Sequence, residues 1–195
     1  MTSQVGLGVL VSGKGSNLRN LVDRGYRVVA VATNRPSCGA AAFARERGTA
    51  LGEFSLKKYE SPGARDGAMS AWLRERGVQV VVNAGYDRIL SPGFVGAFRG
   101  RIVNIHPSLL PAFGGGMDAV ERALAHGVKI TGCTAHLVIE EVDAGPILVQ
   151  AAVPILEGDT LDALRARIQA EERRILPEAI ELIAERIQES APVRQ

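Results

Sequence analysis

The chain has 195 residues, of which 46% are hydrophobic and 23% charged, and its formal net charge is +2. This length favours one domain, and the composition is typical of a globular protein rather than a disordered one. So small a charge, without a block of Lys and Arg, argues against nucleic acid as a partner. The two cysteines lack disulfide or metal-ligand spacing, and neither a signal peptide nor an apolar run near ~20 residues is present. We therefore expect a cytoplasmic protein that does not contact membranes.

Strands and helices alternate in the pattern of the first half. Strands are expected at residues 5–11, 28–33, 78–82 and 102–105, and helices at 16–23, 39–46 and 62–75. Gly25, Gly48 and Gly77 follow the three helices, where a glycine commonly ends a helix. Continuous apolar strands are typical of a parallel sheet covered on both faces. The predicted fold class is therefore α/β, an open, mostly parallel Rossmann-like sheet with helices on both faces.

The second half has a different pattern. Two strands at 131–138 and 145–153, joined by a loop at 139–144, predict a late antiparallel pair. One amphipathic helix is expected at 160–188, kinked or split by Pro177, and residues 191–195 are expected to form a loose tail. Ligands of open α/β sheets bind outside the carboxyl ends of the strands. Because Asn17, Asn34, Gly85 and His106 all follow strands, we expect them to gather at one edge of the sheet.

A glycine loop lies between the first strand and the first helix, with the sequence Ser-Gly-Lys-Gly-Ser-Asn at 12–17. Backbone N–H groups at a helix N-terminus bind anions, and Gly15 permits close approach of a phosphate. Neither the P-loop nor the dinucleotide fingerprint fits, because Gly15 follows Lys14 and Leu18 replaces the third glycine. A tight turn with Ser16 or Asn17 as helix cap explains the loop equally well.

Asn104 and His106 lie on the same side of the strand that Pro107 ends. Such donors suit a site where negative charge develops on an oxygen, and Asp143 could keep the histidine protonated. Asp143-Ala-Gly145 also fits a simple turn. His136 is either a partner of the site or, slightly favoured, a satisfied core residue. A metal site of His106, His136 and Asp143 lacks a compact ligand spacing, so no metal is expected.

Four motifs together resemble the folate-dependent phosphoribosylglycinamide formyltransferases, over about residues 9–177. They are the glycine loop with its following leucine at 12–18, Ala-Gly-Tyr-Asp-Arg-Ile-Leu-Ser-Pro at 84–92, Asn-Ile-His-Pro-Ser-Leu-Leu-Pro at 104–111, and Gly-Cys-Thr-Ala-His-Leu at 132–137 with Val-Asp-Ala-Gly-Pro at 142–146. The third motif, paired with a downstream Asp-x-Gly, is specific to folate formyltransferases and their relatives.

The resemblance implies a role for each matching position. Asn104, His106 and Asp143 would be catalytic. The other implied contacts are Gly15, Ser16 and Asn17 with the substrate's phosphate, Glu172 with its ribose or glycinamide part, and Arg65, Arg88, Ile89, Leu90, Ile139, Glu140, Glu141, Val142 and Asp143 with the folate. Residues 1–195 would form one formyltransferase domain, with a phosphate-binding half at 1–100, a catalytic and folate-binding half at 101–190, and the tail.

The implied reaction transfers the formyl group of 10-formyltetrahydrofolate to the primary amine of glycinamide ribonucleotide by direct attack, as a step of purine synthesis. The partners would be small molecules, with a homodimer as one possible assembly. Two departures from the family pattern stand out. Gly114-Gly115-Gly116-Met117 replaces a Pro-Gly-x-His segment, and Asp87 stands where methionine is common.

Three alternatives share parts of these motifs. Formyltetrahydrofolate deformylase has a similar catalytic trio but carries a regulatory domain before it, whereas the first strand here is expected from Val5. Methionyl-tRNA formyltransferase adds a C-terminal nucleic-acid-binding domain that this length and charge do not favour. A non-catalytic Rossmann-type phosphate or nucleotide-binding module would need only the glycine loop, which leaves Asn104, His106 and Asp143 unexplained.

Overall fold

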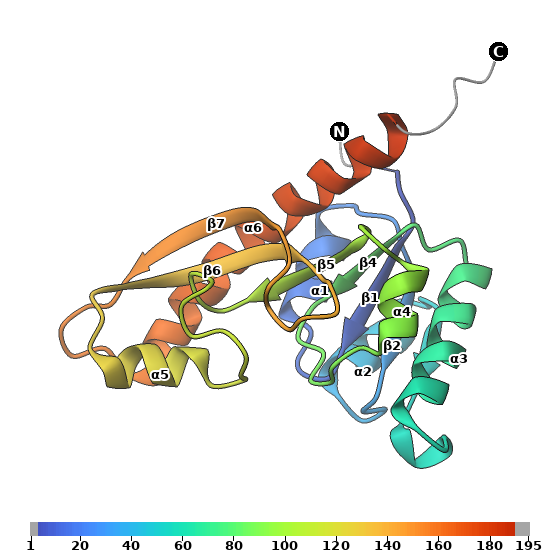
Figure 1. The fold of residues 1–195 in the computed structure, drawn as a ribbon, viewed down its shortest axis with the longest axis horizontal. Helices are drawn as coiled ribbons and strands as arrows, with labels where there is room; N and C mark the ends of the chain where they lie inside the picture. Colours follow the sequence, from blue (N-terminus) through green and yellow to red (C-terminus); the bar gives the residue numbers. More distant parts are fainter. Residues whose placement is uncertain (1–3, 190–195) are drawn as a thin grey trace.

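A computed structural model describes residues 4–189, so the predicted tail at 191–195 lies outside the described residues. The strands within this range form a seven-stranded sheet in the order β3-β2-β1-β4-β5-β6-β7 (Figure 1). They are β1 (Leu7–Val11), β2 (Val28–Thr33), β3 (Leu51–Glu53), β4 (Val80–Asn83), β5 (Ile102–His106), β6 (Ile130–Leu137) and β7 (Ile147–Pro154). The strands β1 to β5 pair in parallel, whereas β6 is antiparallel to β5 and β7 to β6. The predicted fold class is confirmed.

The helices cover both faces of the sheet. They are α1 (Ser16–Asp23), α2 (Gly39–Glu46), α3 (Pro62–Glu75), α4 (Pro92–Ala97), α5 (Ala119–His126) and α6 (Leu161–Glu189), with a short 3-10 helix, η1 (Leu56–Lys58). One apolar core lies between the sheet and α1, α2, α5 and α6, and a second lies between the sheet and α3 and α4. This two-sided burial is the reason why the central strands read as continuous apolar runs.

The predicted bounds of α1, α2 and α3 agree with the structure, and Gly25, Gly48 and Gly77 all have positive φ. Three elements were not predicted: β3, η1 and α4, whereas the end of α5 at His126 was expected from the glycine that follows it. β3 has only three residues, and α4 has six, with two glycines among them. Ser91 starts α4 by accepting a hydrogen bond from the amide of Phe94 at 3.4 Å, and a polar side chain of this kind is a weak signal without an apolar period beside it.

Pro177 does not split α6, which is continuous over 29 residues. A proline within a helix cannot donate to the carbonyl four residues earlier, which here is that of Arg173. The side-chain amide of Asn20 on α1 donates to that carbonyl at 2.8 Å. The freed backbone acceptor is therefore satisfied from a neighbouring helix, and the prediction of a split helix is wrong.

Gly132 on β6 lies so close to β7 that an added Cβ would stand 2.0 Å from the carbonyl oxygen of Ala151. We expect Gly132→Ala to lower the free energy of unfolding by about 1–3 kcal/mol, because the two strands would have to separate. Urea unfolding followed by circular dichroism measures this change. Gly93→Ala is the matched control, because a Cβ there meets nothing within 4 Å; equal stability of the two variants would contradict the expectation.

Candidate active site

A cavity of about 880 Å³ opens at the carboxyl ends of β1, β4 and β5, beside the point where the strand order reverses. Asn17, Gly85 and His106 line it, as expected. Asn34 is not among the lining residues, although its side chain donates to Asp87, which is. The cavity is also lined by residues of the β6–β7 loop and of α6, so both halves of the chain contribute to it.

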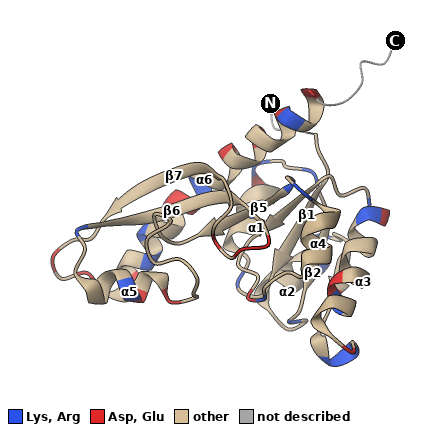
Figure 2. Cartoon of the chain, viewed as in Figure 1, with Lys and Arg blue, Asp and Glu red and all other residues tan. Residues whose placement is uncertain are grey.

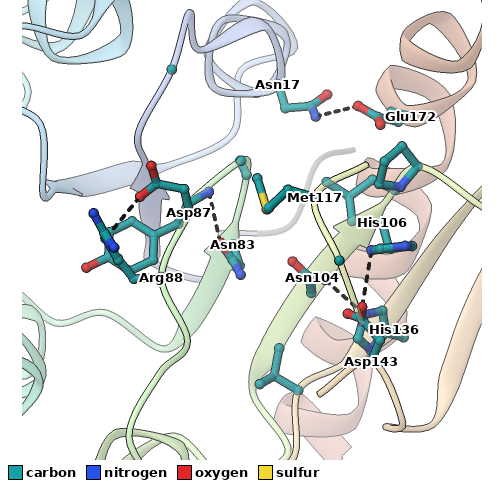
Figure 3. Close-up of a pocket in the computed structure, with 18 of the residues that line it drawn as sticks. Asn17, Asn83, Asp87, Arg88, Asn104, His106, Met117, His136, Asp143 and Glu172 are labelled. Atoms are coloured by element: carbon teal, nitrogen blue, oxygen red, sulfur yellow. Dashed lines mark hydrogen bonds and ion pairs between the residues drawn. The ribbon is translucent and has the colours of Figure 1, made fainter. Parts of the chain in front are cut away.

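Four polar side chains form a connected cluster on one wall of this cavity (Figure 3). The Nδ1 atom of His106 lies 3.4 Å from Oδ2 of Asp143, and Nε2 of His136 lies 3.6 Å from Oδ1 of the same carboxylate. The side-chain nitrogen of Asn104 lies 2.9 Å from Nε2 of His136. The structure thus brings Asn104, His106 and Asp143 together, with His136 as the link between the asparagine and the aspartate.

The pairing of β5 with β6 explains why His136 joins this cluster. In that antiparallel pair Asn104 lies opposite His136, so both side chains point to the same face of the sheet. His136 is only 2% exposed, and its Nδ1 donates to the carbonyl of Leu137. With the proton on Nδ1, its Nε2 accepts from the side-chain amide of Asn104. His136 is therefore both buried and part of the cluster. The prediction that slightly favoured a core residue was only partly correct.

The two turns that present His106 and Asp143 are fixed by backbone contacts. After β5, Thr134 donates to the carbonyl of Ser108 at 2.7 Å and accepts from the amide of Leu110 at 3.0 Å. In the β6–β7 loop Asp143 has a φ of 55°, and a Cβ on Gly145 would stand 1.8 Å from the carbonyl of Leu137. Glycine is therefore required at 145 for the hairpin to close and carry Asp143 back to the histidines.

Burial lowers the pKa of His106, and the charge of Asp143 offsets this effect only in part. The expectation that Asp143 keeps His106 protonated is therefore wrong, because desolvation of the ring outweighs the ion pair. The pKa of Asp143 is itself lowered, by hydrogen bonding with His136 and the amide of Gly115 and by the nearby histidines, against the opposing effect of burial. The site thus favours a neutral imidazole beside an ionised carboxylate.

The segment at 113–117, where the sequence departs from the family pattern, contacts this cluster directly. The carbonyl of Phe113 lies 3.4 Å from Nε2 of His106, and the amide of Gly115 donates to Oδ2 of Asp143 at 2.9 Å. A neutral imidazole has one N–H, so His106 serves either Phe113 or Asp143, but not both. Met117, which is 77% exposed, extends into the cavity opening.

The glycine loop lies across the cavity from the histidines. Gly15, with a φ of 80°, precedes α1, and no side chain caps the N-terminus of that helix. The alternative with Ser16 or Asn17 as cap is therefore wrong. A Cβ on Gly15 would stand 2.7 Å from Cβ of Ala40, so glycine is required by packing as well as by φ. The uncapped helix N-terminus, with its N–H groups and dipole, is suited to an anion.

Asn17 faces the last helix rather than capping the first. Its side chain is 6% exposed, and its amide donates to Oε2 of Glu172 at 3.1 Å. Its own amide oxygen has no hydrogen-bond partner among the described residues. Gly15, Ser16, Asn17 and Glu172 all line the cavity, so the structure brings the four predicted phosphate and ribose contacts together.

Burial raises the pKa of Glu172 to about 7, against the lowering effect of its hydrogen bond from Asn17. The native state then binds a proton that the unfolded chain, with an ordinary glutamate pKa, has lost by neutral pH. Stability should therefore fall as the pH rises, by about 2 kcal/mol between pH 5.5 and pH 8. Urea unfolding at the two pH values measures this, and Glu172→Gln should remove most of the decline. If the stability of Glu172→Gln declined with pH as steeply as that of the wild type, the decline would not be caused by Glu172.

The predicted folate contacts divide into two groups. Arg88, Ile89 and Leu90, together with residues 139–143, line the cavity. Arg65 does not; it is 2% exposed and pairs with the buried Asp66 at 2.7 Å. Asp66 in turn accepts from the amide of Ser91 at 2.7 Å. Arg65 is therefore buried beside the contact of α3 with the start of α4, where it pairs with the carboxylate of Asp66.

Sequence reasoning missed several lining residues. They are Asn83, Gly115, Met117, Asp162, Arg165, Ala166 and Gln169, whereas His136 was considered as a partner of the site but not chosen. The pairing of β5 with β6 gives a signal for His136, because the residue opposite Asn104 must share its face. The residues of α6 have no such signal, because an amphipathic helix shows which face is apolar but not which polar residue reaches a cavity.

Neither a metal-binding group nor a membrane-spanning helix is found in the described part of the chain. Among residues 4–189, no group of three or more His, Cys, Asp or Glu side chains is arranged to hold a metal ion. Within the same range, no helix combines the length and apolar character needed to cross a bilayer.

Comparisons with known proteins identify the family of the chain. The model of the formyl transferase family matches residues 7–180. Phosphoribosylglycinamide formyltransferase of Mycobacterium tuberculosis is 45% identical over 181 residues, which cover 90% of this chain and 83% of that protein. The trifunctional purine biosynthetic protein adenosine-3 of Bos taurus is 41% identical over 90% of this chain, which spans only 18% of that protein.

Solved structures show the same likeness. Glycinamide ribonucleotide transformylase 1 of Symbiobacterium toebii superposes with a TM-score of 0.90 at 47% identity, covering 93% of this chain and 88% of that one. Phosphoribosylglycinamide formyltransferase of Streptococcus pneumoniae has a TM-score of 0.87 at 34% identity, over 94% and 99% of the two chains. With nearly its whole length matched in sequence and in structure, the chain belongs to the formyl transferase family.

Proposed function

We propose that this protein is a phosphoribosylglycinamide formyltransferase, which transfers the formyl group of 10-formyltetrahydrofolate to the amine of glycinamide ribonucleotide. One observation carries the proposal: the cluster of Asn104, His106, His136 and Asp143 shares a single cavity with an uncapped helix N-terminus at the glycine loop. A cradle for phosphate and a set of donors for an oxyanion are the two parts that this transfer requires.

The substrate's phosphate would bind at Gly15, Ser16 and Asn17. The N–H groups of the first turn of α1 would donate to it, and the net positive end of the helix dipole would favour its charge. The side chain of Asn17, whose amide oxygen lacks a partner in the described residues, would accept from a ribose hydroxyl. Glu172 lies beside it and would contact the ribose or the glycinamide part.

The folate would occupy the opposite end of the cavity. Ile89, Met117, Ile139 and Val142 are exposed apolar side chains that line it, and an apolar wall with few polar groups suits a pterin ring. The β6–β7 loop is acidic, with Glu140, Glu141 and Asp143 in sequence (Figure 2). The carboxylates of a folate tail would therefore avoid this loop and lie toward Arg88, without a contribution from the buried Arg65.

In the proposed reaction, the substrate's amine attacks the formyl carbon and forms a C–N bond, and a negative charge develops on the formyl oxygen. The Asn104 amide and an N–H of His106 stabilise this oxyanion. Asp143 orients His106 and helps to relay the proton that the amine loses to the folate nitrogen, whose bond to carbon then breaks. No covalent bond to the enzyme forms.

For His106 to donate to the oxyanion, its N–H must turn from the carbonyl of Phe113 or the carboxylate of Asp143 to the substrate. Because the His106 ring is neutral, no positive charge has to move away from the Asp143 carboxylate, so this change of hydrogen-bond partner costs little free energy.

The further proposals concern the setting of this enzyme. We place it in the cytoplasm, with small molecules as its substrates and no metal in its reaction.

The chain would divide into a phosphate-binding half at 1–100 and a catalytic and folate-binding half at 101–190, with one exception. Arg88, Ile89 and Leu90 belong to the first half but lie on the folate side of the cavity.

Consumption of 10-formyltetrahydrofolate by the purified protein tests the proposed function. We expect absorbance changes from folate turnover only when glycinamide ribonucleotide is added, with formylated product in equal amount. Turnover with water alone would favour the deformylase reaction instead. Binding of both ligands without any turnover would contradict an enzymatic role and favour the non-catalytic module.

A further inference from the structure

A closed ring of three hydrogen bonds joins Ser12, Asn34 and Asp87. The hydroxyl of Ser12 donates to Oδ1 of Asn34 at 2.6 Å, and the amide of Asn34 donates to Oδ1 of Asp87 at 2.8 Å. The backbone N–H of Asp87 then donates to Oγ of Ser12 at 3.0 Å. The Ser12 hydroxyl also lies 3.1 Å from Oδ1 of Asp87, so each of the three residues contacts both of the others directly.

This ring fastens together the two loops that the proposed reaction uses. Ser12 directly follows β1 and is the first residue of the glycine loop, whereas Asp87 directly precedes Arg88 at the proposed folate end of the cavity. Ser12 is 6% exposed, and its N–H also donates to the carbonyl of Gly85 at 3.0 Å. The glycine loop is held from its other side by the amide of Ala40, which donates to Gly13 at 3.0 Å.

The ion pairs of Asp87 contribute less to this arrangement than its hydrogen bonds do. Arg35 pairs with Oδ2 of Asp87. Nε of Arg88 lies 3.6 Å from Oδ1 of the same carboxylate (Figure 3). Both arginine side chains are more than half exposed, at 58% and 53%. Exposed ion pairs contribute little because water screens them. The hydrogen bonds among the more enclosed groups are therefore the contacts that fix the two loops.

We propose that Asp87 is a positioning residue whose hydrogen-bond ring with Ser12 and Asn34 holds the phosphate loop and the folate segment in one fixed arrangement. This inference rests on the proposed function. It accounts for an aspartate at a cavity-lining position where a ligand contact through its side chain is not available, because both carboxylate oxygens are already engaged. Loss of the ring should weaken ligands at both ends of the cavity, although neither loop loses a direct contact.

Isothermal titration with ribose 5-phosphate and, separately, with tetrahydrofolate tests this inference without catalysis. We expect Asp87→Ala to raise both dissociation constants about tenfold. Asp87→Asn keeps an oxygen that can accept from Asn34, so its affinities should stay within about threefold of wild type. Ser12→Ala breaks the same ring and should match Asp87→Ala, and the double variant should be no weaker than either single one.

Asp159→Ala is the matched control, because Asp159 also pairs with an arginine, at 2.6 Å, but is not among the cavity-lining residues. It should lower thermal stability without changing either affinity. Weakening of only one ligand by Asp87→Ala, or equal weakening by Asp87→Asn, would overturn the inference alone. Failure of the wild-type protein to bind either ligand would overturn the proposed function, and this inference with it.

Discussion

His106→Ala is expected to lower kcat by about 10²–10³-fold, the usual effect of removing one donor from an oxyanion site. The reason is that His106 and Asn104 would be the groups that donate to the formyl oxygen as its charge develops. The KM values should change little, because these contacts strengthen only in the transition state. Steady-state kinetics with both substrates measures the split. Asn104→Ala should have an effect of the same order.

The fold should survive this change, because His106 lies at the end of β5 and contacts the segment at 113–117 rather than either apolar core. Circular dichroism and thermal unfolding of the variant serve as the control. His126→Ala is a second control, because His126 ends α5 and is not among the cavity-lining residues. Near-normal kcat in His106→Ala would remove this residue from the mechanism.

Asp143→Asn should lower kcat by about 10²–10⁴-fold, the range found when a group that moves or orients a proton is lost. The asparagine would occupy nearly the same space but would carry no negative charge to orient His106 and to take part in the proton relay. The pKa of Asp143 is lowered, so the carboxylate stays ionised at neutral pH and above. The wild-type rate should therefore not decline on account of Asp143 until the pH falls below the ordinary range of aspartate, near ~4.

Asp143 should also affect the stability of the folded protein in acid. A group whose pKa is lowered by folding stabilises the native state above its ordinary pKa and loses that effect as the pH falls through the lowered value. Acid unfolding of Asp143→Asn should consequently begin from a lower stability but show a shallower dependence on pH in this range. A fall in the wild-type rate between pH 8 and pH 6 that persists in Glu172→Gln but disappears in Asp143→Asn would contradict the assignment of Asp143.

The fold class and the bounds of α1, α2 and α3 could be predicted because local signals coincide there. Apolar runs, helical periods and terminal glycines all point to the same boundaries. The short elements β3 and α4 carry too few residues for any period to appear. The continuity of α6 at Pro177 depends on Asn20, which lies 153 residues away and cannot be recognised locally.

The sequence pattern was enough to place Asn104, His106, Asp143 and the glycine loop at one edge of the sheet, because each follows a predicted strand or ends one. Glu172 lies within α6, so only the family resemblance indicated it. The sequence could not show that Arg65 is buried, because the carboxylate that holds it, Asp66, is its own neighbour and reads as a surface pair. The direction of the pKa shift of His106 was also out of reach. It depends on a balance between burial and an ion pair, and the sequence shows only the ion pair.

The contact between Asn17 and Glu172 spans 155 residues and joins α1 to α6 at the end of the cavity where we propose that phosphate binds. During synthesis on the ribosome, the strands β1 to β5 can pair before the last helix has emerged, but this end of the cavity cannot exist until residue 172 has left the exit tunnel. A chain stalled before that point would present an open sheet edge and an incomplete nucleotide pocket.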